Sequence, residues 1–295
     1  SAYDEAEFYR WNHVPEPEPE FSCCCCPPHW SRRRRLIVWG SALASVILLI
    51  IIIAAGVTVA KRNSFRYVPS DAHVTNAAAF TSGGATRRSV NDTEDGIGAG
   101  RDKYTYYSGE ADLFPPHNEW VSFEDMWQAN LETLQSSCGW LDVGPDNTDS
   151  MIASIHTHIQ SRAAASLVDH RLILAIILQE SNGCVRVGST RSSGGVRNPG
   201  LMQSHNGHAF RAAHEDLSIA QMIQDGTQGT AHGDGLVQNL NLYGSVWRAC
   251  RGYNSGHIPD SEDLSEEAGA TACYVSDVAN RLTGWVRSES RCPNE

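Results

Sequence analysis

One glutamate lies where an acid could do chemistry, at the end of an apolar segment. Residues 172–178 read LILAIIL, and the chain continues Gln179-Glu180-Ser181-Asn182-Gly183. A carboxyl where an apolar helix ends is partly desolvated and feels the negative end of the helix dipole, and both effects raise its pKa. A carboxyl that stays protonated near neutral pH can act as a general acid. Glu180 is the candidate acid, with Ser181 as a possible hydrogen-bond partner; a merely solvated glutamate is the alternative.

Two further blocks could complete a site around this glutamate. Gly200-Leu201-Met202-Gln203 follows twenty residues later, and Tyr253-Asn254-Ser255-Gly256 follows about fifty residues after that. A tyrosine can hydrogen-bond a carboxyl while its ring covers the face of a sugar.

In this order and at these distances, the three blocks resemble the lytic transglycosylase domain of the soluble type, a relative of goose-type lysozyme. The resemblance covers roughly residues 120–287 and is closest to the membrane-anchored fungal members. It implies a mainly α, lysozyme-like helical domain around a buried central helix. It also implies cleavage of β-1,4-linked N-acetylated glycan, either peptidoglycan or a chitin-like polymer, with no cofactor and no metal.

The resemblance also assigns roles to single residues. Glu180 would be the catalytic acid, and Ser181 would orient the substrate or the leaving sugar. Gln203 would contact N-acetyl groups or support the site, and Tyr253 and Asn254 would line the cleft. For Gln203 and Asn254, an amide that only braces a loop is an equal alternative.

Some residues depart from the family pattern. The loop before the second block reads SSGGVRNP, Ser204-His205-Asn206 follows Gln203, and Cys184 directly follows the catalytic turn. These departures leave the fold and the acid in place but put the substrate in doubt. The cysteine suggests a bridge that fixes the catalytic loop.

The mechanism depends on whether a second carboxylate lies near Glu180. Inverting hydrolysis needs a second carboxylate about 6.5–9.5 Å from the first, and no Asp or Glu lies between Glu180 and His214. Asp216 and Asp225 are the remaining candidates. A single acid favours the lytic route, in which the sugar's own 6-hydroxyl closes an anhydro ring. The alternatives are a catalytically inactive glycan-binding protein and a surface protein that acts through its tail.

Helical periodicity predicts the elements around the site. Apolar residues recur at three- and four-residue steps from Trp120 to Leu131 and from Ile152 to Ala163. Segments around 216–226, 235–250 and 273–286 also read as helices, and the Gly-, Ser- and Asn-rich residues 183–210 read as a loop. The uninterrupted apolar segment 172–178 predicts the central helix.

An uncharged segment predicts a membrane anchor. Residues 36–60 carry no charge and are long enough to span a bilayer. Four arginines precede them and Lys61-Arg62 follows, which favours a cytosolic amino terminus and an extracellular or lumenal catalytic domain, as in a single-pass type II membrane protein. We therefore expect a disordered cytosolic tail with Cys and Arg clusters (1–35), a transmembrane helix (36–60), a flexible stalk (61–117) and the transglycosylase domain (118–295).

The nine cysteines divide at this membrane segment. Cys23–Cys26 favour S-palmitoylation over a metal cluster. Five cysteines follow the span, where disulfides persist; one must stay unpaired, and we expect it to be Cys292. Asn91-Asp92-Thr93 is a glycosylation triplet on the expected stalk.

The overall charge limits the partners. The chain has 34 acidic and 23 basic residues, a net charge of −11. Because extended nucleic-acid binding needs a basic surface, this charge excludes it. The expected partners are a polysaccharide and a membrane.

Overall fold

The computed structural model describes residues 30–92, 95–192 and 194–293, and describes residues 58–63 by their backbone alone. Two units make up the chain: the first ends at Ser64 and the second begins at Phe65. Cys23–Cys26 lie outside the described residues, as does Thr93 of the glycosylation triplet.

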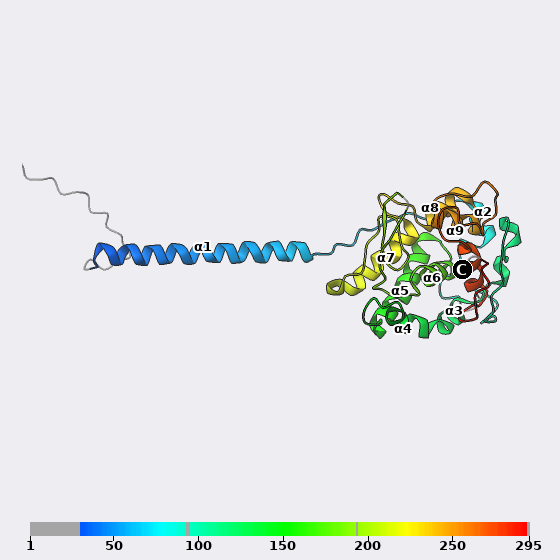
Figure 1. The fold of residues 1–295 in the computed structure, drawn as a ribbon, viewed down its shortest axis with the longest axis horizontal. Helices are drawn as coiled ribbons and strands as arrows, with labels where there is room; N and C mark the ends of the chain where they lie inside the picture. Colours follow the sequence, from blue (N-terminus) through cyan, green and yellow to red (C-terminus); the bar gives the residue numbers. More distant parts are fainter. Residues whose placement is uncertain (1–29, 93–94, 193, 294–295) are drawn as a thin grey trace, which may run out of the picture. The chain divides into compact units, whose positions relative to one another are not determined.

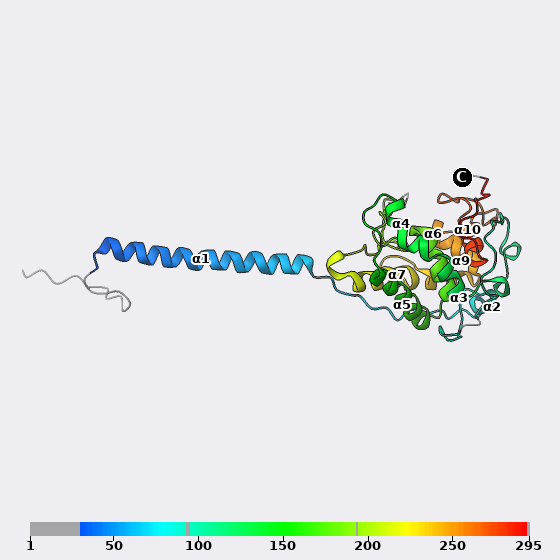
Figure 2. The ribbon, with the colours of Figure 1, turned by 90° about the horizontal axis from the view of Figure 1, so that it is seen from below.

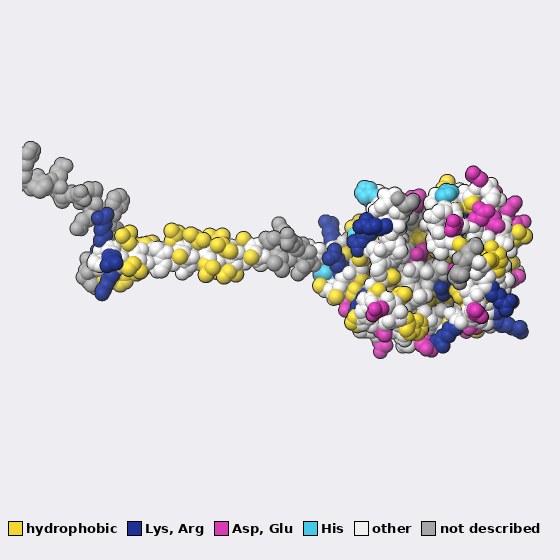
Figure 3. Space-filling view, in the orientation of Figure 1, with side chains coloured by type: hydrophobic (Ala, Val, Ile, Leu, Met, Phe, Trp, Pro, Cys, Tyr) yellow, Lys and Arg dark blue, Asp and Glu magenta, His cyan; other side chains and the backbone are white. Residues whose placement is uncertain are grey.

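The first unit contains one long apolar helix. Helix α1 (Arg32–Asn63) begins at Ser31, whose hydroxyl accepts a hydrogen bond from the Arg34 amide (3.4 Å). Its portion Arg32–Val57 is long and apolar enough to cross a membrane, and its apolar side chains are exposed along its length (Figure 3). The predicted span 36–60 lies within α1, which starts earlier because the arginines also adopt helical geometry.

The second unit is mainly helical, as predicted (Figures 1 and 2). Its only described strands, β1 and β2, form a short antiparallel hairpin. The elements in chain order are α2 (Ala77–Ser82), η1 (Ala111–Leu113), η2 (His117–Glu119), α3 (Phe123–Ala129), α4 (Leu131–Trp140), α5 (Asp149–Ser166), α6 (His170–Ser181), β1 (Thr190–Arg191), β2 (Arg197–Asn198), η3 (Ala212–His214), α7 (Glu215–Gln228), α8 (Leu236–Tyr243), α9 (Val246–Ser255) and α10 (Tyr274–Leu282).

Helix α6 is the centre of this unit. Every residue from His170 to Leu178 is buried, and α3, α5 and α10 all pack against it (Figures 1 and 2). Asp169 begins the helix by accepting a hydrogen bond from the Arg171 amide (2.9 Å). The uninterrupted apolar segment therefore forms the buried central helix that the sequence predicts.

Two predicted helices are each divided in two. The segment 120–131 contains all of α3 and the start of α4, which meet at Asn130, and the segment 235–250 contains α8 and the first half of α9. Gly244, between α8 and α9, has φ 65°, a left-handed conformation that glycine adopts without a steric penalty. The spacing of apolar residues did not predict either helix end, because apolar residues continue from the first helix of each pair into the second.

Residues from Phe65 to 117 are not the flexible stalk that we expected. Val74, Ala79, Tyr104 and Phe114 are buried within the second unit. The Val74 amide donates to the Ser166 carbonyl (2.8 Å). The polar composition of this segment suggested a flexible linker. A few apolar residues are nevertheless enough to anchor the segment in the domain, and polar groups of the domain form hydrogen bonds with its backbone. The folded domain therefore begins near Phe65 rather than at 118.

The disulfides correct one prediction. Cys138 pairs with Cys184, and Cys273 pairs with Cys292. Cys250 is free and fully buried within α9. The expectation that Cys292 is the free cysteine is wrong, because the carboxyl-terminal segment returns to the start of α10 and brings Cys292 to Cys273.

Candidate active site

The last turn of α6 presents Glu180 and then turns sharply. Asn182 (φ 50°) and Gly183 (φ 78°) both have left-handed backbone conformations. A Cβ atom at Gly183 would lie 2.2 Å from Cδ2 of Leu134 in α4, and both this close approach and the left-handed backbone favour glycine. The next residue, Cys184, is bonded to Cys138 of α4. The turn after the glutamate is thus fixed by packing and by a covalent bond, and the bridge expected at Cys184 is confirmed.

Asn147, which the sequence did not single out, fastens the same turn. Its Nδ2 donates to the carbonyls of Leu134 and Gly183, both at 2.8 Å, and its Oδ1 accepts from the Val185 amide at 3.2 Å. One buried amide therefore satisfies three backbone groups around the glutamate turn. An asparagine shortly before a helix start gives no distinctive pattern, so the sequence alone offered no signal for it.

Among the described residues, the partly buried carboxyl of Glu180 has one hydrogen-bond partner. The Tyr274 hydroxyl donates to its Oε1 at 2.6 Å. Burial raises the pKa of Glu180 to about 7, against the opposing effect of the Tyr274 hydrogen bond, which favours the carboxylate. The predicted upward shift is confirmed, and desolvation is its main cause.

Tyr274, the first residue of α10, is the site residue that the sequence analysis missed. It is 2% exposed, and burial followed by the nearby charge of Glu180 raises the pKa of its phenol well above the ordinary value. The phenol therefore stays protonated and donates to the carboxylate throughout the neutral range. Its position directly after a cysteine that forms a disulfide was the one available signal.

A polar network holds α10 against α6 beside the acid. Gln179 donates to Asp277 (3.0 Å) and accepts from Nε of Arg281 (2.9 Å). The Tyr104 hydroxyl donates to the same aspartate at 2.5 Å. In this way residues before, within and after the central helix all fix the position of Tyr274.

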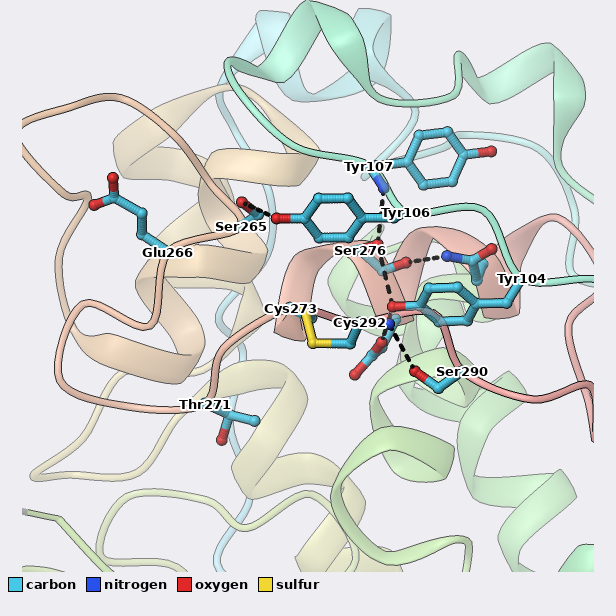
Figure 4. Close-up of a disulfide and its surroundings, with 12 residues drawn as sticks. Tyr104, Tyr106, Tyr107, Ser265, Glu266, Thr271, Cys273, Ser276, Ser290 and Cys292 are labelled. Carbon is cyan, nitrogen blue, oxygen red and sulfur yellow. Dashed lines mark hydrogen bonds between the residues drawn. A yellow bond between two sulfur atoms is a disulfide. The ribbon is translucent and has the colours of Figure 1, made fainter. Parts of the chain in front are cut away.

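The segment Tyr104–Tyr107 lies along the other side of α10. Figure 4 shows it next to the Cys273–Cys292 disulfide, with the Tyr107 amide donating to the Ser276 hydroxyl (3.0 Å). Tyr106 donates to Ser265 at 3.0 Å, and Ser290 accepts from the Cys292 amide at 3.2 Å (Figure 4). The expected stalk thus contributes to the wall that supports the site.

Ser181 adjoins Glu180 in sequence but does not hold its carboxyl. Its hydroxyl donates to the carbonyls of Ile177 (2.9 Å) and Leu201 (2.8 Å), and the side chain is buried. Because Leu201 belongs to the second block, Ser181 joins that block to the end of α6. The hydrogen bonds of the Ser181 hydroxyl therefore go to backbone groups rather than to the Glu180 carboxyl.

Gln203 braces the loop before it. Its Nε2 donates to the carbonyls of Gly188 (2.9 Å) and Gly200 (3.0 Å), and its Oε1 accepts from the Thr190 amide (2.9 Å). Its backbone is left-handed, with φ 45°. All the close partners of this amide are backbone groups, as in the loop-bracing alternative.

Tyr253 and Asn254 come from the end of α9. The Tyr253 hydroxyl donates to the Met202 carbonyl at 2.7 Å, and its pKa is raised well above normal by burial and by the charge of nearby Glu180. Asn254 accepts from the Arg251 guanidinium and from the Thr271 amide (3.1 Å). Tyr253 therefore lies beside the acid, whereas Asn254 braces the loop that leads to Tyr274.

Both candidates for a second carboxylate are bound elsewhere. Asp225 is buried in α7 and accepts from the amide and ring of His208, both at 2.8 Å, and from Gln221 at 2.8 Å. Asp216 accepts from Ser154 (2.6 Å) and pairs with His158 (2.9 Å) on an exposed surface. Neither hydrogen-bonds Glu180 or Tyr274.

The part of the chain that the structure describes contains no group of three His, Cys, Asp or Glu residues suited to a metal ion. The chemistry that this site offers is that of one proton-holding carboxyl flanked by two phenols.

Comparison with known proteins identifies this region. Residues 157–272 match the sequence model of the family described as Transglycosylase SLT domain, which spans α6, the second block and the third block. This is an enzyme family that cleaves peptidoglycan glycan. Neither curated proteins nor solved structures gave a significant match.

Proposed function

Because residues 157–272 form a transglycosylase SLT domain, we propose that this protein cleaves the β-1,4 linkages of a peptidoglycan-type glycan with Glu180 as its catalytic acid. The observation that carries the assignment is the Glu180 carboxyl, whose pKa is raised to about 7 and which accepts a hydrogen bond from a buried tyrosine. General acids work best when their pKa lies near the working pH.

The proposed reaction uses this carboxyl twice. Protonated Glu180 donates its proton to the glycosidic oxygen, and the bond from that oxygen to C1 breaks. The resulting carboxylate then takes the proton of the sugar's 6-hydroxyl while the 6-oxygen bonds to C1. An anhydro ring closes, no water is consumed, and Glu180 is protonated again for the next turnover. A pKa near neutrality suits both transfers.

The lytic outcome is supported by the placement of the other carboxylates. Inverting hydrolysis would need a base that activates water about 6.5–9.5 Å from the acid. Asp225 already accepts three hydrogen bonds, and Asp216 is occupied by Ser154 and His158. A single acid with two neighbouring phenols fits ring closure by the substrate's own hydroxyl better.

The other site residues have graded roles in this proposal. Tyr274 orients Glu180 and stabilises its carboxylate, and Tyr253 lines the substrate side of the acid. Ser181, Gln203 and Asn254 position the second block, the hairpin loop and the loop before Tyr274, respectively. Their hydrogen bonds to backbone groups support this division.

We further propose that α1 is a retained anchor with the catalytic unit outside the cytosol. The four arginines before the span outnumber Lys61 and Arg62 after it, and the second unit contains two disulfides. Protease added to intact cells should release a soluble fragment containing the second unit. Cleavage of the amino-terminal tail alone would reverse this orientation.

Product analysis tests the reaction itself. The full chain in detergent should convert peptidoglycan strands into products that are lighter by one water than hydrolysed ones, as measured by mass spectrometry. Asp225→Asn should leave the anhydro product unchanged. Hydrolysed products that vanish in Asp225→Asn would assign that aspartate as a base. Binding of glycan without any cleavage would favour an inactive glycan-binding protein.

A further inference from the structure

One stretch of this acidic protein contains no acidic residue. Residues 181–214 include four arginines and three histidines but no Asp or Glu, although the chain as a whole has a net charge of −11. Figure 3 shows several basic side chains together on the side of the second unit where α7 lies in Figure 1, away from a group of acidic ones. The stretch also contains the second block, so this local positive charge adjoins the proposed active site.

Two of these arginines lie directly opposite one another. In the β1–β2 hairpin, Arg191 pairs in register with Arg197. Residues at opposite positions of an antiparallel pair project from the same face with Cβ atoms about 4.5–5.5 Å apart, and like charges there are destabilising. Both residues are exposed. Repulsion between the two guanidinium groups therefore destabilises the hairpin unless an anion binds between them.

No carboxylate of the described residues offsets this charge. Arg191 donates to the Gly195 carbonyl (3.0 Å), and Nε of Arg197 donates to the Ser189 hydroxyl (2.9 Å). Neither arginine takes part in any of the ion pairs found among the described residues, whereas partly buried Arg248 and exposed Arg287 pair with Glu262 and Glu132. The hairpin therefore presents two guanidinium groups whose hydrogen bonds within the protein go only to neutral atoms.

Hydrogen bonds connect the hairpin to the proposed catalytic residue. Ser181, next to Glu180, binds the Leu201 carbonyl, and Gln203 binds Gly188 and Thr190 at the start of the hairpin. The arginines are thus held at a fixed position relative to the second block.

We propose that Arg191 and Arg197 form a binding site for carboxylate groups of an acidic glycan strand, which rests on the proposed glycan-cleaving function. Guanidinium groups bind carboxylates through paired, charge-assisted hydrogen bonds. Peptidoglycan carries carboxylates on its stem peptides and on any lactyl group that bears no peptide, whereas chitin oligomers are neutral. The site would therefore favour acidic strands over chitin-like polymers. Two guanidinium groups fall far short of the basic surface that a nucleic acid needs.

Binding measured without turnover tests this proposal. Full-length protein in detergent would carry Glu180→Gln, alone or with Arg191→Gln and Arg197→Gln. The matched control combines Glu180→Gln with Arg87→Gln and Arg101→Gln, which remove the same charge from exposed arginines elsewhere. The ligands are soluble uncross-linked peptidoglycan strands and neutral chitin oligomers.

The hairpin variant should bind the acidic strands about 10-fold more weakly at low salt, and its affinity should depend less on salt concentration. Its affinity for chitin oligomers should equal that of the control. Its thermal midpoint should match or exceed the control's, because a like-charge pair is removed.

Equal weakening toward both ligands, or the same loss in the control, would overturn the proposal. Competition by inorganic phosphate far stronger than by acetate at equal ionic strength would also overturn it, by assigning the site to phosphate. If the parent protein binds acidic strands through these arginines but cleaves none, the proposed function fails while the binding site stands.

Discussion

The two ends of α6 differ in the partners of their acidic side chains. At the amino end, Asp169 and Arg171 form a buried ion pair (2.7 Å), and His170 contacts Asp95 at 2.5 Å. At the carboxyl end, Glu180 has one uncharged donor, Tyr274. Both ends are desolvated by the same helical core, so the difference lies in the partners.

The carboxyl pKa values record this difference. Burial by itself would raise the pKa of Asp95, but the hydrogen bond and charge of His170 and the charge of Arg171 lower it below its ordinary value. At Glu180 burial prevails over the single phenol, and the pKa rises to about 7. A buried acid with cationic partners supports structure, whereas one without them keeps a proton available for transfer.

Removal of the unpaired acid should have the largest effect. Glu180→Gln should lower turnover of peptidoglycan strands by about 10²–10⁴-fold, since an amide of the same shape donates no such proton. The activity of the parent should fall as pH rises through about 7, where Glu180 loses its proton. Turnover numbers across pH for both proteins provide the check. Undiminished turnover in this variant would remove Glu180 from the mechanism.

Substitution of the buried ion pair at the amino end of α6 should lower stability and leave turnover unchanged. Arg171→Met removes the buried guanidinium that pairs with Asp169 and Asp95, and breaking a buried ion pair in this way typically costs about 3–5 kcal/mol of unfolding free energy. Arg287→Met, which removes an exposed partner of Glu132, should cost less than about 1 kcal/mol. Denaturant titration measures both. Turnover per folded molecule should match the parent's, and a selective loss of turnover would contradict the division between the two ends.

Removing the phenol would make the two ends differ further. Tyr274→Phe deletes the hydrogen bond that favours the carboxylate, so the pKa of Glu180 should rise further and the alkaline limb of the activity profile should move upward by up to about one pH unit. The loss of orientation should lower turnover about 10-fold. Tyr106→Phe, whose hydroxyl contacts Ser265, is the matched control and should leave the profile in place. If the pH–activity profile of Tyr274→Phe coincides with that of the parent, the Tyr274 hydroxyl does not affect the pKa of Glu180.

The smallest effect concerns stability at the uncharged end. Because the folded protein holds the Glu180 proton more tightly than the unfolded chain does, this group destabilises the fold as pH rises from about 4.5 to about 7. Glu180→Gln should therefore be more stable than the parent at pH 8.5, by about 1–3 kcal/mol, and nearly equal at pH 4. Calorimetry at both pH values, with exposed Glu119→Gln as the control, would show it. The same difference at pH 4 would point to packing instead.

The central helix and its acid were predictable because they depend on local features. An uninterrupted apolar segment dictates burial, and the position of Glu180 at its end favoured a desolvated carboxyl over the alternative of a solvated one. The raised pKa of Glu180 therefore followed from the sequence, as did the bridge at Cys184.

Tyr274 and Asn147 were not predictable in this way, because their roles depend on contacts between distant segments. The Tyr274 hydroxyl reaches Glu180 across 94 residues of sequence, and Asn147 reaches Gly183 across 36. The prediction of a flexible stalk was wrong for a related reason. Its backbone is satisfied by side chains of α7, such as Gln221, whose Oε1 accepts from the Val68 amide at 2.7 Å.

Cys250 gives the domain an odd thiol that is chemically quiet. Burial raises its pKa to about 12, so only about one molecule in 10⁵ holds it as a thiolate at pH 7. Disulfide exchange proceeds through the thiolate and needs access to the bridge, and this sulfur has neither. Cys250 is the free cysteine of the described residues, and its sulfur is therefore unable to attack the two disulfides beside Glu180 and Tyr274.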